Sequence, residues 1–242
     1  MSKFLSLLVL IIFPITGASN PVMISHAGGL LAETPYTNSK ESFQNSYLQG
    51  FDYLEVDLRR TSDGHTVLIH DWDNTWKKIF HQKSHNPTYE EFMSAQLIFT
   101  QLDLTEFLDE IRNYPNLKII LDIKDNVFLI LEEISSLAPD LKTRLIPQVF
   151  TEEQSIYTKN LGFHHFLLAL YRMDTIDIES LSSFFEEHHP LGFTVSQERV
   201  FSNEYAPLLN RYPTYVFTVN SEEKIKELKK FPFIKGIFTD RL

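Results

Sequence analysis

The chain contains no cysteine, which excludes a disulfide framework, a zinc site built from thiolates and a cysteine nucleophile. Clustered basic residues are also missing. Lys plus Arg number 22 against 32 Asp plus Glu, and no basic run stands out, so nucleic acid is not expected as a partner. No Gly/Ser-rich linker or low-complexity tract divides the chain. What remains, 43% apolar and 22% charged residues, is typical of a globular protein.

The N-terminus has the organisation of a secretory signal peptide. Lys3 supplies a positive charge, the run from Phe4 to Ile15 is almost entirely apolar, and small residues precede the polar pair Ser19-Asn20. The apolar run is shorter than the roughly 20 residues that a membrane span needs. We expect residues 1–18 to be a signal peptide, with cleavage and retention as an anchor both open. The mature protein is then exported, to the periplasm or the medium.

Short apolar runs rich in Val, Ile, Leu and Phe alternate with helical patterns along the rest of the chain. We predict strands over 22–25, 52–58, 117–123, 145–150, 166–171, 191–195, 214–219 and 235–239. We predict helices over 39–48, 103–113, 126–137, 152–160, 176–187, 203–210 and 221–230. This alternation favours βα units around a parallel sheet, and residues 19–242 are expected to form one α/β domain, a (β/α)8 TIM barrel.

A small insertion is expected after the second barrel strand. The turn signal Asp63-Gly64 predicts a hairpin that adds a strand over 66–70. The segment 72–101 has little regular pattern and carries several aromatic residues. Two interpretations of this segment stay open: a lid over the active site, or a surface loop that packs its own aromatic side chains.

Carboxylates lie on the inward face of two early strands. Glu55 and Asp57 share a face because side chains alternate along a strand, and Asp122 ends the next barrel strand. Two carboxylates on an otherwise apolar face are unfavourable unless a cation compensates them, and oxygen ligands suit Ca²⁺ or Mg²⁺. The alternative is ion pairing with Arg59, Arg60 or a neighbouring strand.

Two histidines and a lysine also lie at strand ends, where TIM barrels carry their function. His26 follows the first predicted strand, and His70 ends the hairpin strand with Asp71 beside it as a candidate to orient the ring. Lys124 shares a face with Asp122, so it is placed to hold a ligating carboxylate or an anionic substrate.

Together these residues resemble the glycerophosphodiester phosphodiesterase family, within the wider phosphatidylinositol-phospholipase-C-like barrels. The motifs that carry the resemblance are His26-Ala27-Gly28-Gly29, Thr37-Asn38-Ser39, the segment 50–57, Thr61-Ser62-Asp63-Gly64, and the segments 67–71, 119–124, 215–220 and 236–240. The resemblance implies that His26 and His70 are an acid/base pair. It implies that Glu55, Asp57 and Asp122 bind the divalent cation, Ca²⁺ or Mg²⁺.

The resemblance also implies a substrate-binding set. Lys124 matches a family lysine, Asn38 is retained from the family's Glu-Asn-Thr triplet, and Phe217 stands where the family often has an aromatic residue. Phe217 is thus expected to line the glycerol or lipid portion, with plain core packing as the alternative. Asp122 stands where most of the family has Glu, and it matches the Asp of the related sphingomyelinase D barrels.

Two departures from the family pattern concern the phosphate and the cation. Ala27 replaces the Arg of the His-Arg-Gly motif, so the metal and Lys124 must take over its contact with the phosphate. Thr37 replaces the family Glu of the triplet, which removes one ligand. Glu41, one helical turn further on, is a candidate substitute, with a solvent-facing helix residue as the alternative.

The implied function is metal-dependent hydrolysis of glycerophosphodiesters to glycerol 3-phosphate and an alcohol. Which histidine is acid and which is base stays open, as does the oligomeric state. One alternative is phospholipase D- or sphingomyelinase D-like cleavage of lysophospholipids or sphingolipids, with association at a membrane surface. Another is a catalytically impaired barrel that binds an anionic ligand or an envelope protein. The pairs His164-His165 and His188-His189 lack a carboxylate at useful sequence spacing and are not expected to bind metal.

Overall fold

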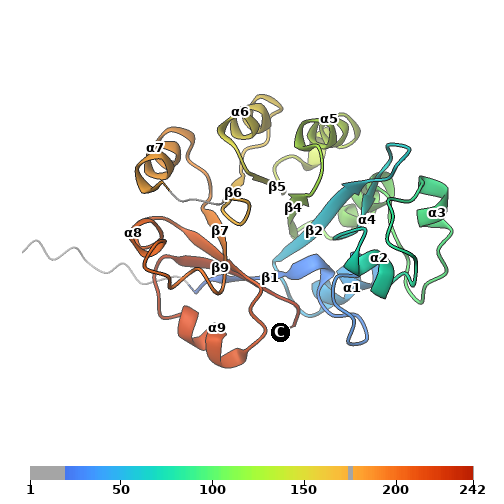
Figure 1. Ribbon diagram of the computed structural model, residues 1–242, viewed down its shortest axis with the longest axis horizontal. Helices are drawn as coiled ribbons and strands as arrows, with labels where there is room; N and C mark the ends of the chain where they lie inside the picture. Colours follow the sequence, from blue (N-terminus) through green and yellow to red (C-terminus); the bar gives the residue numbers. More distant parts are fainter. Residues whose placement is uncertain (1–19, 174–176, 242) are drawn as a thin grey trace, which may run out of the picture.

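Eight parallel strands close into a barrel in residues 20–173 and 177–241, the part of the chain that the computed structural model describes (Figure 1). The expected signal peptide, 1–18, lies outside these residues. The barrel strands are β1 (Val22–Ser25), β2 (Tyr53–Arg60), β4 (Lys118–Ile123), β5 (Leu145–Val149), β6 (Leu167–Ala169), β7 (Phe193–Ser196), β8 (Thr214–Phe217) and β9 (Ile234–Thr239). Parallel pairing of β1 with both β2 and β9 closes the sheet. The predicted (β/α)8 barrel is therefore confirmed.

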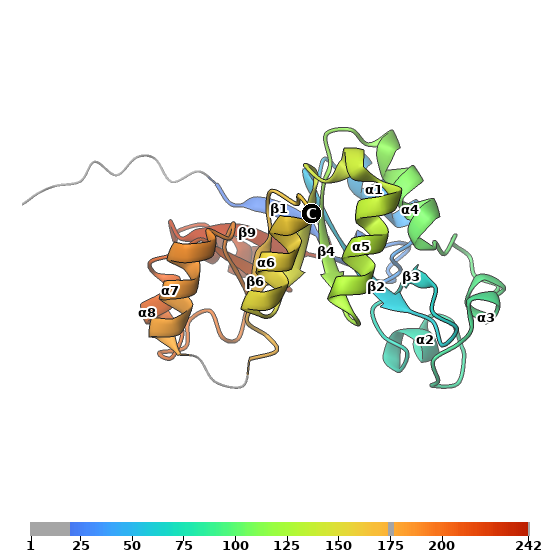
Figure 2. The same ribbon diagram turned by 90° about the horizontal axis from the view of Figure 1, so that it is seen from above.

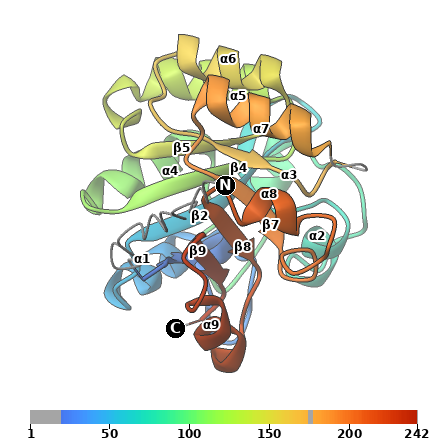
Figure 3. The same cartoon turned by 90° about the vertical axis from the view of Figure 1, so that its left-hand side faces the viewer.

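Helices surround the barrel, one after most strands. They are α1 (Lys40–Leu48), α4 (Leu104–Glu110), α5 (Val127–Leu137), α6 (Glu152–Asn160), α7 (Ile178–His188), α8 (Ala206–Leu209) and α9 (Glu222–Leu228). Figure 3 shows α5, α6 and α7 on one side of the barrel and α9 on the opposite side. No helix of the described residues combines the length and the apolar character needed to cross a membrane.

Polar caps explain where most of these helices begin. The side chains of Ser39, Asp103, Asn126, Thr151 and Ser221 each accept a hydrogen bond from the backbone three residues on, as N-cap residues do. Two predicted helices are shorter than expected. The predicted helix 103–113 ends as α4 and continues as the 3₁₀ turn η2 (Ile111–Asn113). The predicted helix 203–210 is only α8, because Pro207 lacks an N–H and belongs in the first turn of a helix.

The core has one layer inside the barrel and a second layer between the barrel and its helices. Inside, the buried side chains are those of Ile24, Ile120, Ile146, Leu167, Tyr215 and Phe238. Outside, Leu54, Val56 and Leu58 of β2 pack against helical residues such as Phe43 and Phe107. Alternate residues of β2 thus face outward into apolar packing, which leaves Glu55 and Asp57 facing the interior of the barrel.

The insertion after β2 forms a small unit with its own core. Strand β3 (Thr66–Leu68) pairs antiparallel with β2, and the short helices α2 (Asn74–Lys78) and α3 (Tyr89–Met93) follow. The expectation of little regular structure over 72–101 was wrong in this respect. Its aromatic residues form one buried cluster with β3, namely Trp72, Trp76, Phe80 and Phe92 with Val67 and Ile69. Figure 2 shows β3, α2 and α3 together at one side of the barrel. The segment therefore packs its own aromatic side chains.

Candidate active site

Three buried carboxylates from β2 and β4 meet inside the barrel. The parallel register pairs Asp57 with Asp122, and Glu55 lies two residues before Asp57 on the same face. One oxygen of each carboxylate lies within 4.8 Å of the others. The residues are 2%, 0% and 6% exposed for Glu55, Asp57 and Asp122. The predicted acidic set is therefore brought together in a place that water barely reaches.

Among the described residues, Lys124 is the lysine that pairs with these carboxylates. Its Nζ lies 3.0 Å from Asp57 Oδ1 and 2.5 Å from Asp122 Oδ2. Burial lowers the pKa of this ammonium, but Asp57 and Asp122 raise it above its usual range, so Lys124 stays charged. Burial also raises the pKa of Asp57, yet Lys124 and the nearby histidines bring it below its usual range. For Glu55, burial and the charge of Asp57 both raise the pKa.

The donor set fits a divalent cation. Asp57 Oδ1 is buried and has no hydrogen-bond partner. Its one close polar neighbour among the described contacts is Lys124 Nζ, 3.0 Å away in an ion pair. Glu55 Oε2 accepts only the backbone N–H of Ala27 at 2.8 Å, which leaves its other oxygen available. Three carboxylates against one ammonium leave uncompensated negative charge in a buried place. Oxygen ligands of this kind are those that Ca²⁺ and Mg²⁺ take.

His26 is held by the last strand of the barrel. Its Nδ1 lies 2.9 Å from Asp240 Oδ1, directly after β9. Asp240 is fixed in turn by Asn220, whose Oδ1 accepts the Asp240 backbone N–H at 2.9 Å. Burial lowers the pKa of the His26 imidazole, but Asp240 and Glu55 raise it above its usual value overall. His26 could be predicted from the sequence but its partner Asp240 could not, because only the closure of the barrel brings them together.

His70 has an equivalent carboxylate partner. Its Nδ1 lies 2.8 Å from Asp71 Oδ2, as expected for a residue that orients the ring. The Thr75 hydroxyl donates to the same carboxylate oxygen at 2.9 Å. Burial raises the pKa of Asp71, but the hydrogen bonds from His70 and Thr75 lower it to about 2. Asp71 is therefore ionised at neutral pH and fixes the ring through the Nδ1 proton.

Tyr36 lies between the two histidines, and no motif or periodicity in the sequence points to it. Its ring centroid is 4.9 Å from that of His26 and 4.9 Å from that of His70, both edge-on. Burial and then the charge of Asp240 raise the pKa of the Tyr36 hydroxyl to about 12, so it stays protonated. The residue has a φ of 62°, a left-handed conformation that no propensity rule assigns to tyrosine.

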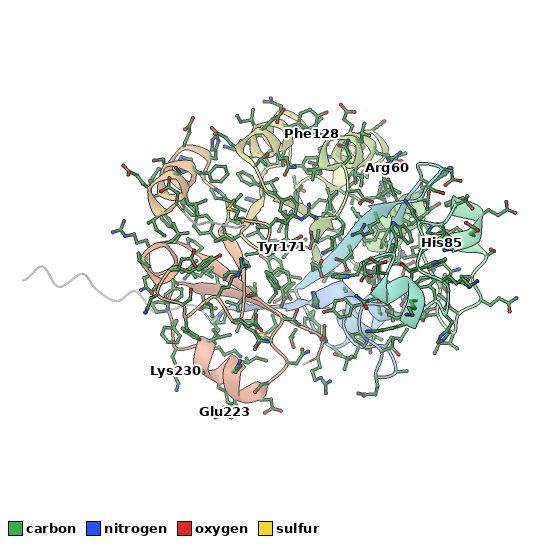
Figure 4. The ribbon with its side chains drawn as sticks, in the orientation of Figure 1. Arg60, His85, Phe128, Tyr171, Glu223 and Lys230 are labelled. Atoms are coloured by element: carbon green, nitrogen blue, oxygen red, sulfur yellow. The ribbon has the colours of Figure 1, made fainter. Side chains whose placement is uncertain are left out.

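A cavity of about 200 Å³ joins these groups, and we call it the reaction cavity. It is lined by His26, Tyr36, Glu55, His70, Asp122, Lys124, Gln148, Tyr171, Phe217, Thr218 and Phe238. Tyr171 lies near the middle of the barrel (Figure 4). Its hydroxyl donates to Asp122 Oδ1 at 2.9 Å. Phe217 lines the cavity and also packs against Phe238, with ring centroids 6.2 Å apart. Phe217 therefore has one face on the reaction cavity and another in the core packing.

Asn38 and Glu41 take positions different from those expected. Asn38 is fully buried, and its Nδ2 donates to Asp57 Oδ2 at 3.0 Å while its Oδ1 accepts the Asp57 N–H. It thus holds a candidate ligand rather than facing the reaction cavity. Both oxygens of Glu41 accept hydrogen bonds from Thr100 in the insertion. Glu41 therefore ties α1 to the insertion and does not replace the missing family Glu.

Ala27 stands where the family has an Arg, and its short side chain does not line the reaction cavity. The residue is fully buried in the turn η1 (His26–Gly28) with a φ of 48°. The next residue, Gly28, has a φ of 85°, and a Cβ there would lie 2.2 Å from Ser42 Oγ, so only glycine fits. Lys124 is thus the ammonium available to a phosphate in the reaction cavity.

A second group of candidate ligands lies on the helical layer, away from the reaction cavity. His188 at the end of α7 lies 3.1 Å from Glu152 at the start of α6, and Glu187 completes a set within 4.8 Å. The spacing of residues along the sequence does not reveal this group, because Glu152 lies on another helix. Both glutamates are exposed, and no chemistry is assigned to this group.

The family comparison agrees with the geometry. Residues 26–164, more than half of the chain, match the sequence profile of the family described as "Glycerophosphoryl diester phosphodiesterase family". A comparison with curated protein sequences finds no match.

Solved structures show the same fold. A glycerophosphodiester phosphodiesterase from Thermotoga maritima is 21% identical with a TM-score of 0.72, covering 92% of this chain and 95% of the other. One from Parabacteroides distasonis is 19% identical with a TM-score of 0.73, covering 93% and 94%. A phosphodiesterase from Oleispira antarctica, solved with the product sn-glycerol-3-phosphate, is 19% identical with a TM-score of 0.68, covering 91% and 93%.

Proposed function

This chain belongs to the glycerophosphoryl diester phosphodiesterase family, and from that membership we propose a metal-dependent hydrolysis that releases glycerol 3-phosphate and an alcohol. The observation that carries the proposal is that one cavity is lined by two histidines, each bound to an aspartate, and by Glu55 and Asp122 of the cluster of three carboxylates. General acid–base groups and a site for a cation thus face the same small volume, as phosphodiester cleavage requires.

Glu55, Asp57 and Asp122 would hold the cation, Ca²⁺ or Mg²⁺. When bound, the cation supplies positive charge that polarises the phosphoryl group and stabilises the charge developing on it. Asn38 keeps Asp57 in position through two hydrogen bonds. Lys124 binds the phosphate in place of the Arg that Ala27 replaces, since it is the ammonium lining the reaction cavity.

The histidines move the protons. In each ring Nδ1 is bound to a carboxylate, so Nε2 is the atom available to the substrate. One imidazole removes the proton from the glycerol hydroxyl next to the ester oxygen. The deprotonated hydroxyl oxygen then attacks phosphorus. The bond to the leaving alcohol breaks as the other imidazole donates a proton to it. Water then opens the cyclic phosphate with the two roles reversed.

A soluble diester is favoured over a lipid substrate. Apolar side chains of 72–101 at the surface would favour a lipid substrate. Trp72, Trp76, Phe80 and Phe92 are instead buried in their own cluster, and Ile98 is the large apolar residue of the segment that stays exposed. The impaired-barrel alternative is disfavoured by the presence of both Asp–His pairs.

The test is release of glycerol 3-phosphate from glycerophosphocholine and glycerophosphoethanolamine by the purified protein, with Ca²⁺, Mg²⁺ or EDTA. We expect EDTA to abolish release, and His26→Ala or His70→Ala to lower kcat by about 10²- to 10⁴-fold. His164→Ala, an exposed histidine outside the reaction cavity, is the matched control. Turnover that survives both EDTA and His26→Ala would contradict the proposal.

We also propose that the protein is exported. The support is the charged, apolar and small-residue pattern of 1–18, which is that of a signal peptide. N-terminal sequencing of protein recovered outside the cytoplasm should begin near Ser19 if the signal is cleaved, and at Met1 if it is retained as an anchor. Recovery of the chain only from the cytoplasm would contradict export.

A further inference from the structure

The reaction cavity is too small for a whole diester, and a second hollow lies beside it. About 200 Å³ is below the usual size of a site that encloses a complete small ligand. A neighbouring groove of about 530 Å³ lies between the segment 33–36 and residues of α2 and its two ends, from His70 to Ile79. We call it the α2 groove. Tyr36 and His70 line both spaces, so the two are continuous at these side chains.

We propose that the α2 groove is the subsite for the leaving alcohol and that it selects amino alcohols; this rests on the proposed function. In a phosphoryl displacement the attacking and leaving oxygens lie roughly in line through phosphorus. If the glycerol phosphate occupies the reaction cavity, the alcohol points out past Tyr36 and His70. The His70 side chain is 36% exposed and faces the groove, whereas that of His26 is 11% exposed and lines only the reaction cavity. His70 is then the group that protonates the leaving alcohol.

The charges of the α2 groove favour an ammonium group on that alcohol. Glu33, Asp71 and Lys78 all line the groove, and Asp71 is bonded to His70. Asp71 is paired with His70, which carries the proton for the leaving alcohol, so Glu33 is the carboxylate of this lining left to bind a cation, with Lys78 as the opposing charge. Of the two carboxylates, Glu33 is the exposed one, and its carboxylate belongs to no ion pair among the described residues. An ethanolamine or choline group therefore finds its counter-charge at Glu33.

The backbone holds Glu33 in a defined place. Leu31 and Thr34 exchange two backbone hydrogen bonds, of 3.0 and 2.9 Å, around the turn that carries it. Ala32 and Glu33 have φ values of 46° and 67°, left-handed conformations that persist in non-glycine residues only where the surroundings impose them. The carboxylate thus has less freedom to lose on binding than one on an unconstrained loop.

The experiment compares two substrates that differ only in the leaving alcohol: glycerophosphoethanolamine, whose alcohol carries an ammonium, and glycerophosphoglycerol, whose alcohol is uncharged. Glu33→Gln should lower kcat/KM for the ethanolamine diester about three- to fivefold, through KM, and leave the glycerol diester unchanged. Lys78→Gln should shift the ratio of the two kcat/KM values in the opposite direction. Glu223→Gln on α9, an exposed glutamate on another face (Figure 4), is the matched control.

The possible outcomes distinguish a failure of the proposed subsite from a failure of the proposed reaction. If Glu33→Gln and Lys78→Gln leave the substrate ratio of an active enzyme unchanged, or alter both substrates equally, the α2 groove does not select the alcohol. If the wild-type protein releases glycerol 3-phosphate from neither substrate, the proposed function itself is overturned, and the subsite with it.

Discussion

His26 Nδ1 lies 2.9 Å from Asp240 Oδ1, although 214 residues separate the two in the chain. The contact exists because β1 pairs with β9, and the register places Ser25 opposite Thr239, one residue before each partner. Closing the barrel therefore completes the first Asp–His pair. The second pair, His70 with Asp71, is made by neighbours in sequence and sits on the insertion. Tyr36 lies between the two rings.

Asp240→Asn should lower kcat about 100-fold with little change in KM, because an amide no longer fixes the His26 ring or favours its protonated form. Asp240 and Glu55 raise the pKa of His26 against the effect of burial, so removing the Asp240 charge should lower that pKa. Steady-state kinetics and an NMR titration of His26 measure the two effects. Asp109→Asn, at an exposed carboxylate on α4, is the control. Equal kinetics for the two variants would remove Asp240 from the mechanism.

His70→Ala should be rescued by a leaving group that needs no proton. On glycerophosphoethanolamine the variant should lose about 100-fold in kcat, and on the p-nitrophenyl diester of glycerol 3-phosphate less than about tenfold. His26→Ala should lose about 100-fold on both substrates, since a base is required whichever alcohol leaves. Stopped assays of glycerol 3-phosphate release measure both. The opposite pattern, with His26→Ala rescued, would assign the acid role to His26.

Cation binding should stabilise the folded protein through Asp57. At a concentration of about 100 times the dissociation constant, a ligand that binds only the native state adds about 2.7 kcal/mol of stability. We therefore expect Ca²⁺ or Mg²⁺ to raise the Tm of the wild-type protein by several degrees, and EDTA to reverse the rise. In Asp57→Asn the rise should disappear, whereas the exposed Glu223→Gln variant should keep it. A Tm that rises equally in Asp57→Asn would place the cation elsewhere.

The insertion should depend on its aromatic cluster for stability. Phe92 is fully buried among Trp72, Trp76 and Phe80, so Phe92→Ala should lower the free energy of unfolding by about 3–5 kcal/mol. Ile98 of the same segment is 89% exposed, and Ile98→Ala should change it by less than about 0.5 kcal/mol. Urea unfolding followed by tryptophan fluorescence measures both. Similar midpoints for the two variants would mean that the cluster does not stabilise the segment.

The sequence sufficed for the barrel and for the groups that strands carry. The strands coincide with apolar runs, the period of two puts Glu55 and Asp57 on one face, and the next strand brings Asp122 alongside. Asp71 could be expected because it neighbours His70 in the chain. These features depend on local periodicity and on the known order of strands in a TIM barrel.

The remaining site residues could not be predicted because they depend on loop conformation or on distant contacts. Tyr36 reaches the histidines through a left-handed backbone. Asn38 was expected to bind substrate, and another left-handed position brings it to Asp57 instead. Tyr171 meets Asp122 only because β6 and β4 end at the same rim of the barrel. Glu41 was a plausible ligand from helical spacing, but a hydrogen-bonded contact with Thr100 of the insertion takes both its oxygens.

The most direct test of the account is a crystal structure of the protein with Ca²⁺ and glycerol 3-phosphate. We expect the cation on Glu55, Asp57 and Asp122, and the phosphate in the reaction cavity within hydrogen-bond reach of Lys124 and of both histidines. The glycerol should point into the barrel towards Phe217, leaving the α2 groove free for the departed alcohol. A phosphate bound outside this cavity, or a cation that shares no ligand with the three carboxylates, would contradict it.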